Sequence, residues 1–106
     1  QNFTSVSDTC QFLQDVCQGA LPHADDMLAL LKQQQFTWKI PAGVPDDVVT
    51  ANKTGELSDT ENDAAIIFAP KGTYILSVMS TSLQDRNNAQ QMIRELSAMI
   101  YDYLNA

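Results

Sequence analysis

The segment that decides the fold is Ala51–Pro70, "ANKTGELSDTENDAAIIFAP". Its residues 64–69 are all apolar, without the alternation that marks a strand with one exposed face. Such a run is typical of a strand that is covered on both faces, and residues 70–72 after it have the composition of a turn. Residues 48–54 are rich in β-branched side chains and predict a second strand. We therefore expect the apolar run to be the middle strand of a small sheet.

The rest of the chain predicts one more strand and three helices. Residues 73–81 follow the turn so closely that their strand must run antiparallel to the one before it. A first helix is expected at about 6–18, after a capping pair of Ser5 and Asp8 and before a C-capping Gly19. A second helix is expected to begin at Pro22, and a third at about 87–104, where apolar residues follow the i, i+3, i+4, i+7 rule.

This order predicts an α+β fold that forms one unit over residues 1–106. It consists of two N-terminal helices, a three-stranded antiparallel sheet and a C-terminal helix packed on the sheet. The terminal helix would cover one face of the middle strand and the helical pair the other. Trp38 and Ile40 are expected to anchor the irregular segment between the second helix and the sheet.

Composition and charge exclude several classes of function. The chain has 106 residues, 44% hydrophobic and 18% charged, as expected of one globular domain. Its formal net charge is −7 with only 6 Lys and Arg, which disfavours nucleic acid and anionic membrane surfaces as partners. No apolar run approaches the roughly 20 residues of a spanning helix, so we expect no membrane insertion.

The two cysteines are expected to be buried free thiols. Cys10 and Cys17 lie on one predicted helix with Cα atoms about 10 Å apart, beyond the roughly 7 Å that a disulfide allows. The single histidine, His23, has no cluster of further ligands near it in the sequence. We therefore predict no metal site, and nothing in the chain indicates a cofactor.

Lys53-Thr54-Gly55 lies at the end of the strand predicted over residues 48–54, just before the apolar strand. In this setting the triplet resembles the third signature element of the class A β-lactamase and penicillin-binding serine hydrolase family. The resemblance is to the C-terminal part of that family and runs along nearly the whole chain. It is carried by "SVSDTCQFLQDVCQG", "ADDMLALLKQQ" and "IPAGVPDDVVTANKTGEL".

The resemblance implies a substrate-binding role for four consecutive residues. The Lys53 ammonium would lie near the floor of the site and favour an anionic, β-lactam-like substrate. Thr54 would offer its hydroxyl to the substrate carboxylate, and Gly55 would leave room for substrate along the strand edge. The backbone N–H of Glu56 would be one of two oxyanion-hole donors. Without the resemblance, the same residues would be a solvated lysine, a β-favouring threonine and a turn glycine.

The other catalytic elements that the resemblance implies are absent from this chain. It contains no Ser-x-x-Lys and no Ser-Asp-Asn, and the family's omega-loop glutamate would fall upstream of Gln1. The nucleophile is therefore missing, and we expect the chain to be inactive alone. The family's carboxylate-binding arginine is also absent, since the strand has Asn62 and Asp63 there. Lys39 could substitute from a distance, although a solvated surface lysine is the simpler interpretation.

Two hypotheses for function remain. In the first, the chain is a fragment of an antibiotic-resistance enzyme, and its partner is the N-terminal portion of the same fold, which completes a site for the β-lactam-like ligand. In the second, it is a non-catalytic α+β module that uses its sheet edge for self-association or protein binding. An uncompleted sheet predicts a homodimer or a strand-exchanged assembly. The family resemblance implies an extracytoplasmic location.

Overall fold

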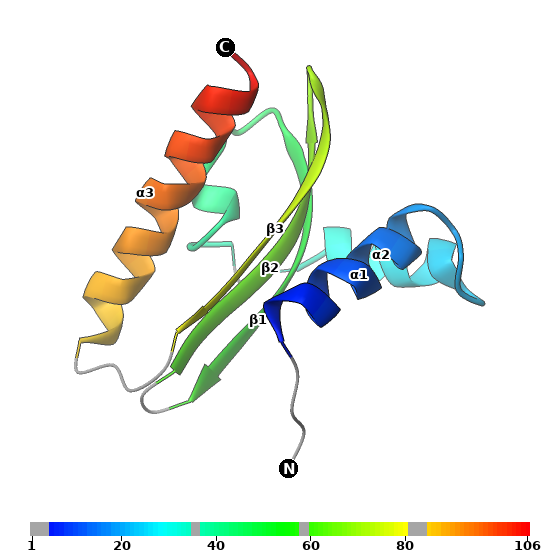
Figure 1. Cartoon of the computed structure of the whole chain (residues 1–106), viewed down its shortest axis with the longest axis horizontal. Coiled ribbons are helices and arrows are strands. Elements are labelled where there is room, and N and C mark those ends of the chain that lie inside the picture. The colour runs from blue at the N-terminus through cyan, green and yellow to red at the C-terminus, as the bar shows by residue number, and fades with distance from the viewer. Residues whose placement is uncertain (1–4, 35–36, 58–59, 81–84) are drawn as a thin grey trace.

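The computed structural model describes residues 5–34, 37–57, 60–80 and 85–106, and it has the predicted α+β fold (Figure 1). Ranges predicted from the sequence agree with its helices and strands to within a few residues. In chain order the elements are α1 (Val6–Cys17), α2 (Ala24–Lys32), the 3-10 helix η1 (Pro41–Gly43), β1 (Val49–Leu57), β2 (Thr60–Ala69), β3 (Gly72–Ser80) and α3 (Arg86–Leu104).

The sheet has the strand order β1-β2-β3 with antiparallel pairing throughout. Pairing is continuous, from Val49 opposite Phe68 to Leu57 opposite Thr60, and from Glu61 opposite Ser80 to Ala69 opposite Gly72. Figure 1 shows α3 on one side of the sheet and α1 with α2 on the other. The middle strand is therefore covered on both faces, as its apolar run predicts.

Alternate residues of β2 supply two separate cores. On the α3 side, Ala65 and Ile67 pack with Ile93 of α3 and with residues of the segment before β1. On the α1 side, Ala64 and Ile66 pack with Leu13 of α1. Ala65, Ile66 and Ile67 are all fully buried, so burial of β2 on both faces holds the three layers together.

The helix ends confirm part of the sequence analysis and correct part of it. Ser5 caps α1 by accepting a 3.0 Å hydrogen bond from the backbone N–H of Asp8, and Gly19 has a φ of 73° just beyond the helix. The expectation that Pro22 begins the second helix was wrong. α2 begins at Ala24, because His23 adopts a left-handed conformation with a φ of 60° that a helix cannot include.

The segment between α2 and β1 is held against α3 by backbone contacts. Ser97 of α3 donates a 2.7 Å hydrogen bond to the carbonyl of Ile40, which is fully buried. A Cβ on Gly43 would lie 2.4 Å from the carbonyl oxygen of Arg94, so η1 and α3 approach too closely for any side chain there. Trp38 does not anchor the segment through burial, since it is 37% exposed.

Gly43→Ala should lower the free energy of unfolding by about 1–3 kcal/mol, because the new methyl group collides with the backbone of α3. Urea unfolding followed by circular dichroism measures this loss. Ala42→Ser, at the exposed neighbouring position, is the control and should change stability by less than about 0.5 kcal/mol. A Gly43→Ala variant as stable as the control would contradict the close contact.

Candidate functional site

The four predicted site residues lie in succession on β1, which is an edge strand of the sheet. Lys53, Thr54, Gly55 and Glu56 pair with the β2 residues Ala64, Asp63, Asn62 and Glu61. Neighbouring residues in a strand point to opposite faces, so Lys53 and Thr54 diverge. The structure therefore places the Lys53 side chain in solvent on one face and the Thr54 side chain in a buried position on the other.

Lys53 lies on the α1 side of the sheet and is exposed. Its partner Ala64 belongs to the core beneath α1, yet the helices leave the Lys53 side chain open to solvent. Its ammonium donates a 2.6 Å hydrogen bond to the carbonyl of Thr54, its neighbour in the chain. Among the residues that the structure describes, none covers the Lys53 side chain to form the expected floor of a site.

The opposite face of the same strand is buried and polar. Asn52, Thr54 and Asp63 are 1%, 7% and 1% exposed. One carboxylate oxygen of Asp63 accepts a 2.9 Å hydrogen bond from the backbone N–H of Ile40, and the other accepts a 3.2 Å bond from the Asn52 amide. Asp63 thus joins β1, β2 and the segment before η1 at one point beside Thr54.

Burial raises the pKa of Asp63 above its ordinary value, because desolvation penalises the charged carboxylate. The hydrogen bonds from Ile40 and Asn52, and then the charge of Lys39, act in the opposite direction but do not offset the desolvation. The carboxylate is therefore held in place by polar contacts that only partly compensate its removal from water.

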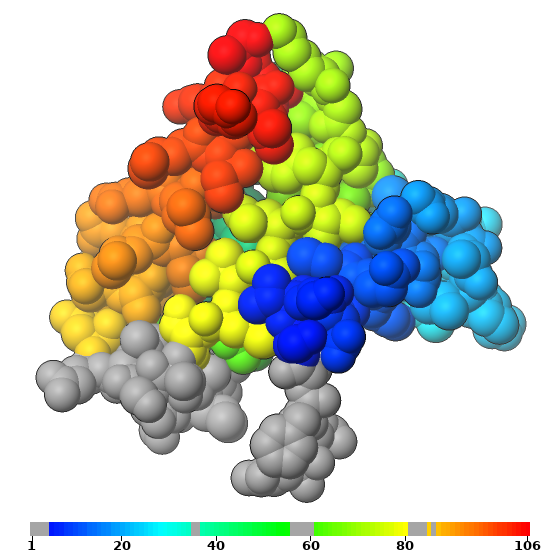
Figure 2. Space-filling model, viewed as in Figure 1, coloured from blue at the N-terminus to red at the C-terminus, as the bar shows by residue number. Residues whose placement is uncertain are grey.

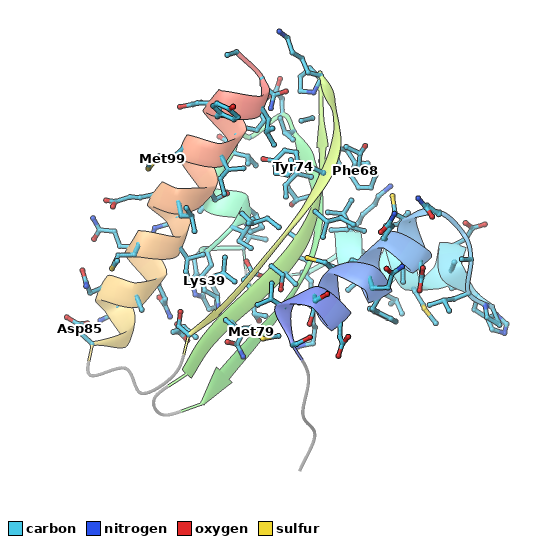
Figure 3. The ribbon with its side chains drawn as sticks, in the orientation of Figure 1. Lys39, Phe68, Tyr74, Met79, Asp85 and Met99 are labelled. Atoms are coloured by element: carbon cyan, nitrogen blue, oxygen red, sulfur yellow. The ribbon has the colours of Figure 1, made fainter. Side chains whose placement is uncertain are left out.

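Lys39 lies in this buried region, so its interpretation as a solvated surface lysine was wrong. The residue is fully buried, and its ammonium donates a 2.6 Å hydrogen bond to the backbone carbonyl of Asn62. Asn62 is the strand partner of Gly55, so the cation reaches the sheet directly beside the Lys-Thr-Gly segment. Figure 3 shows Lys39 between the sheet and α3.

Sequence reasoning underestimated Lys39 because its only local signal is its position beside a buried isoleucine. A second acidic group is also fully buried here: Glu61 accepts a hydrogen bond from the side-chain amide of Gln90 on α3. No residue pattern marked Glu61 as buried, since it lies in a polar stretch of sequence. The α3 face of this sheet end therefore combines one cation with two carboxyl groups.

The hollows lined by described residues do not include Lys53 in their walls. One of about 400 Å³ lies beside the beginning of β1 and η1, lined by Thr37, Pro41, Ala42, Pro45, Asp46, Val48 and Thr50. Within the described ranges, no three His, Cys, Asp or Glu side chains cluster as metal ligands would, and no helix is long and apolar enough to cross a membrane. Cys10 and Cys17 are free thiols, but both are only half-buried.

Asp63→Asn should remove the part of the pH dependence of stability that comes from the Asp63 carboxyl. A native pKa above the unfolded value of about 3.9 means that the folded state binds the proton more tightly. Wild type should therefore gain stability relative to the variant as the pH falls from 7 to about 4.5. Part of this gain is present at pH 4.5, and the whole of it, about 1.4 kcal/mol for each unit by which the pKa is raised, is reached only below the unfolded pKa of about 3.9.

Urea unfolding of both proteins at the two pH values measures that difference, and every other titrating group is common to them. The side-chain oxygen of the new asparagine can still accept the hydrogen bond from the Ile40 N–H. The Asn52 amide can rotate so that its oxygen accepts a hydrogen bond from the new side-chain NH2, so the variant is expected to fold. Parallel pH profiles, or a wild type that loses stability relative to the variant in acid, would contradict the raised pKa.

The chain is similar to known proteins in both sequence and fold. The beta-lactamase enzyme family matches residues 1–104 of the chain. A beta-lactamase of Bacillus licheniformis is 41% identical over 71 residues, which are 62% of this chain and 22% of that protein. The beta-lactamase structure from Sphaerobacter thermophilus has a TM-score of 0.91 and 26% identity, covering 99% of this chain and 42% of that one.

A structure of PBP-A has the same fold, with a TM-score of 0.83 and 24% identity over 96% of this chain and 40% of that one. The chain thus spans less than half the length of these relatives. Its helices and strands follow their architecture from end to end. The chain belongs to the beta-lactamase enzyme family, as a partial copy of that fold.

Proposed function

We propose that the chain supplies the substrate-binding strand of a class A β-lactamase-type serine hydrolase and is inactive by itself. The complete protein would form an acyl-enzyme from a β-lactam or a related amide and then hydrolyse it. The observation that supports this most strongly is the placement of Lys53, Thr54 and Gly55 on the free edge of β1, with Lys39 buried beside Gly55.

Each site residue has a distinct part in the proposed reaction. Lys53 attracts the anionic substrate and favours loss of the serine proton, because an ammonium stabilises negative charge that develops nearby. Thr54 donates its hydroxyl to the substrate carboxylate. Gly55 lets the substrate lie against the strand, where no side chain obstructs it, and the N–H of Glu56 donates to the oxyanion.

Lys39 is the candidate for the missing carboxylate-binding cation. Its ammonium donates to the carbonyl of the β2 residue opposite Gly55, and because the side chain is fully buried it would act on a bound carboxylate through its charge. Asp63 lies one residue further along β2, and the charge of Lys39 lowers the pKa of its carboxyl against the larger effect of burial. A buried cation in a region of low dielectric attracts a carboxylate more strongly than an exposed one does.

The nucleophile and its bases would come from polypeptide outside these 106 residues. That portion would lie over the α1 side of the sheet, where Lys53 is open to solvent. The exposure of Lys53 is then the consequence of an incomplete site. Following the family, we propose an extracytoplasmic location for the complete enzyme and a role in antibiotic resistance.

A chimera tests the proposal. This chain would replace the matched part of the Sphaerobacter thermophilus beta-lactamase, whose structure superposes on 99% of this chain. The chimera should hydrolyse a chromogenic β-lactam, whereas the free chain should not. Lys53→Ala in the chimera should lower kcat/KM by at least about 100-fold, as loss of a group that stabilises transition-state charge does.

Lys71→Ala is the matched control, because it removes the same charge from an exposed lysine at the β2–β3 turn. It should change kcat/KM by less than about twofold. A chimera that folds with the thermal stability of its parent but shows no hydrolysis would overturn the proposed function. So would a Lys53→Ala variant as active as the control.

Lys39→Met should act mainly on substrate binding. Methionine keeps the apolar stem and removes the charge, so the KM of the chimera should rise about tenfold or more while kcat falls less. The preference for a substrate over its carboxylate methyl ester should shrink by a similar factor. Equal losses in kcat for acid and ester would show that Lys39 does not bind the carboxylate.

A further inference from the structure

Two of the groups proposed to act on the substrate carboxylate come from different parts of the chain. Thr54 lies on β1, whereas Lys39 lies in the irregular segment between α2 and β1. β1 pairs with β2 only from Val49 onward, so strand pairing does not hold Lys39 in position. The effect of a charge on a ligand depends on its distance from that ligand. The placement of Lys39 relative to Thr54 therefore depends on contacts made by side chains.

One side chain contacts both parts of the chain. Asp63 is the β2 residue opposite Thr54 in the strand pairing. Its carboxylate accepts a 2.9 Å hydrogen bond from the N–H of Ile40, the residue that follows Lys39. Its other oxygen accepts a 3.2 Å hydrogen bond from the side-chain amide of Asn52, which lies on the same face of β1 as Thr54. Asp63 thus links the neighbour of the cation to the strand of the hydroxyl.

These contacts lie in the interior of the protein. In the space-filling view of Figure 2, α3, β3, α1 and α2 make up most of the described surface. Asp63 and Asn52 are each 1% exposed, and Ile40 is fully buried. The carbonyl of Ile40 also accepts a 2.7 Å hydrogen bond from Ser97 of α3. Hydrogen bonds away from water are stronger than exposed ones, so this link is suited to holding a defined geometry.

We infer that Asp63 is a positioning residue for substrate binding in the complete protein. By bonding β1 to the segment before η1, it fixes the charge of Lys39 relative to the hydroxyl of Thr54. The preference of the site for a substrate that carries a carboxylate then depends on the hydrogen bonds of Asp63, although Asp63 does not touch the substrate. The inference rests on the proposed function, and it adds the residue that sets this preference.

Two substitutions separate the hydrogen bonds of Asp63 from its charge. The negative charge of Asp63 opposes binding of an anionic substrate, so any neutral replacement changes the electrostatics as well as the contacts. Asp63→Asn removes the charge and keeps an oxygen that can accept from the Ile40 N–H. Asp63→Ala removes both the charge and the acceptor. Comparison of the alanine variant with the asparagine variant therefore isolates the hydrogen bonds.

The chimera with the Sphaerobacter thermophilus beta-lactamase tests the inference through substrate preference. The measured quantity is the ratio of kcat/KM for a chromogenic β-lactam to kcat/KM for its carboxylate methyl ester. This ratio should be at least about fivefold lower in Asp63→Ala than in Asp63→Asn, because the Lys39 charge is no longer held in place. A general loss of structure would lower kcat/KM for acid and ester alike.

Ile67→Ala is the matched control. Ile67 lies on the same strand and the same face as Asp63 and is fully buried, but its side chain makes only apolar contacts. Its truncation costs stability and should change the acid-to-ester ratio by less than about twofold. In the Lys39→Met background, Asp63→Ala and Asp63→Asn should have the same ratio, because the cation that Asp63 positions is gone.

Hydrogen exchange in the free chain reports on the link directly. Relative to the amides paired between β2 and β3, the Ile40 amide should exchange at least about tenfold faster in Asp63→Ala than in Asp63→Asn. If Asp63→Ala does not fold, Asn52→Ala replaces it in the chimera. That variant cuts the link from the β1 side and leaves Asp63 and Lys39 in place. It should lower the acid-to-ester ratio at least about twofold relative to the unsubstituted chimera.

The outcomes distinguish this inference from the proposed function. A well-folded chimera that hydrolyses no β-lactam overturns the proposed function and the inference with it. An active chimera in which the alanine and asparagine variants have equal acid-to-ester ratios overturns the inference alone. So does a difference between them that persists after Lys39→Met, or an Asn52→Ala ratio equal to that of the unsubstituted chimera.

Discussion

Burial of β2 on both faces is the constraint on which the rest of the structure depends. Ala64 and Ile66 face α1, while Ala65 and Ile67 face α3, and all four are almost inaccessible to water. A strand of this kind is stable only between two covering layers, so α3 must pack on one face and the α1–α2 pair on the other. β1 and β3 pair with β2 from its two sides and are the edge strands of the described sheet, so Lys53-Thr54-Gly55 lies on an edge strand.

The polar end of β2 has the opposite character and contains the candidate site. Asp63 links Asn52 of β1 to the backbone of Ile40, and Lys39 contacts the residue next to Asp63. Buried charges are costly, and proteins retain them where a defined geometry or a function requires it. In this chain they connect the strand that carries the Lys-Thr-Gly segment with the segment that carries the second cation. The pKa of Asp63 is raised because burial removes its carboxylate from water.

The fold could be predicted from the sequence because its signals are local and strong. The unbroken apolar run of β2, the turn after it and the periodicity of α3 each have one good structural interpretation. Lys39 could not be placed in the same way, because its burial depends on contacts with Asn62 and Asp63, more than 20 positions away. The left-handed conformation of His23 and the close approach at Gly43 also arise from tertiary geometry. The site residues on β1 were found through a family signature, and their roles stay predictions.

The central claim is that the free edge of β1 receives the anionic end of an acyl substrate. Its most direct test is a crystal structure of the chimera trapped with a slowly hydrolysed β-lactam. The account predicts that Thr54 Oγ1 and the Lys53 ammonium lie within about 2.7–3.2 Å of the ligand carboxylate, and that the Glu56 N–H points at the acyl oxygen. A covalently bound ligand whose carboxylate contacts none of these residues would contradict it.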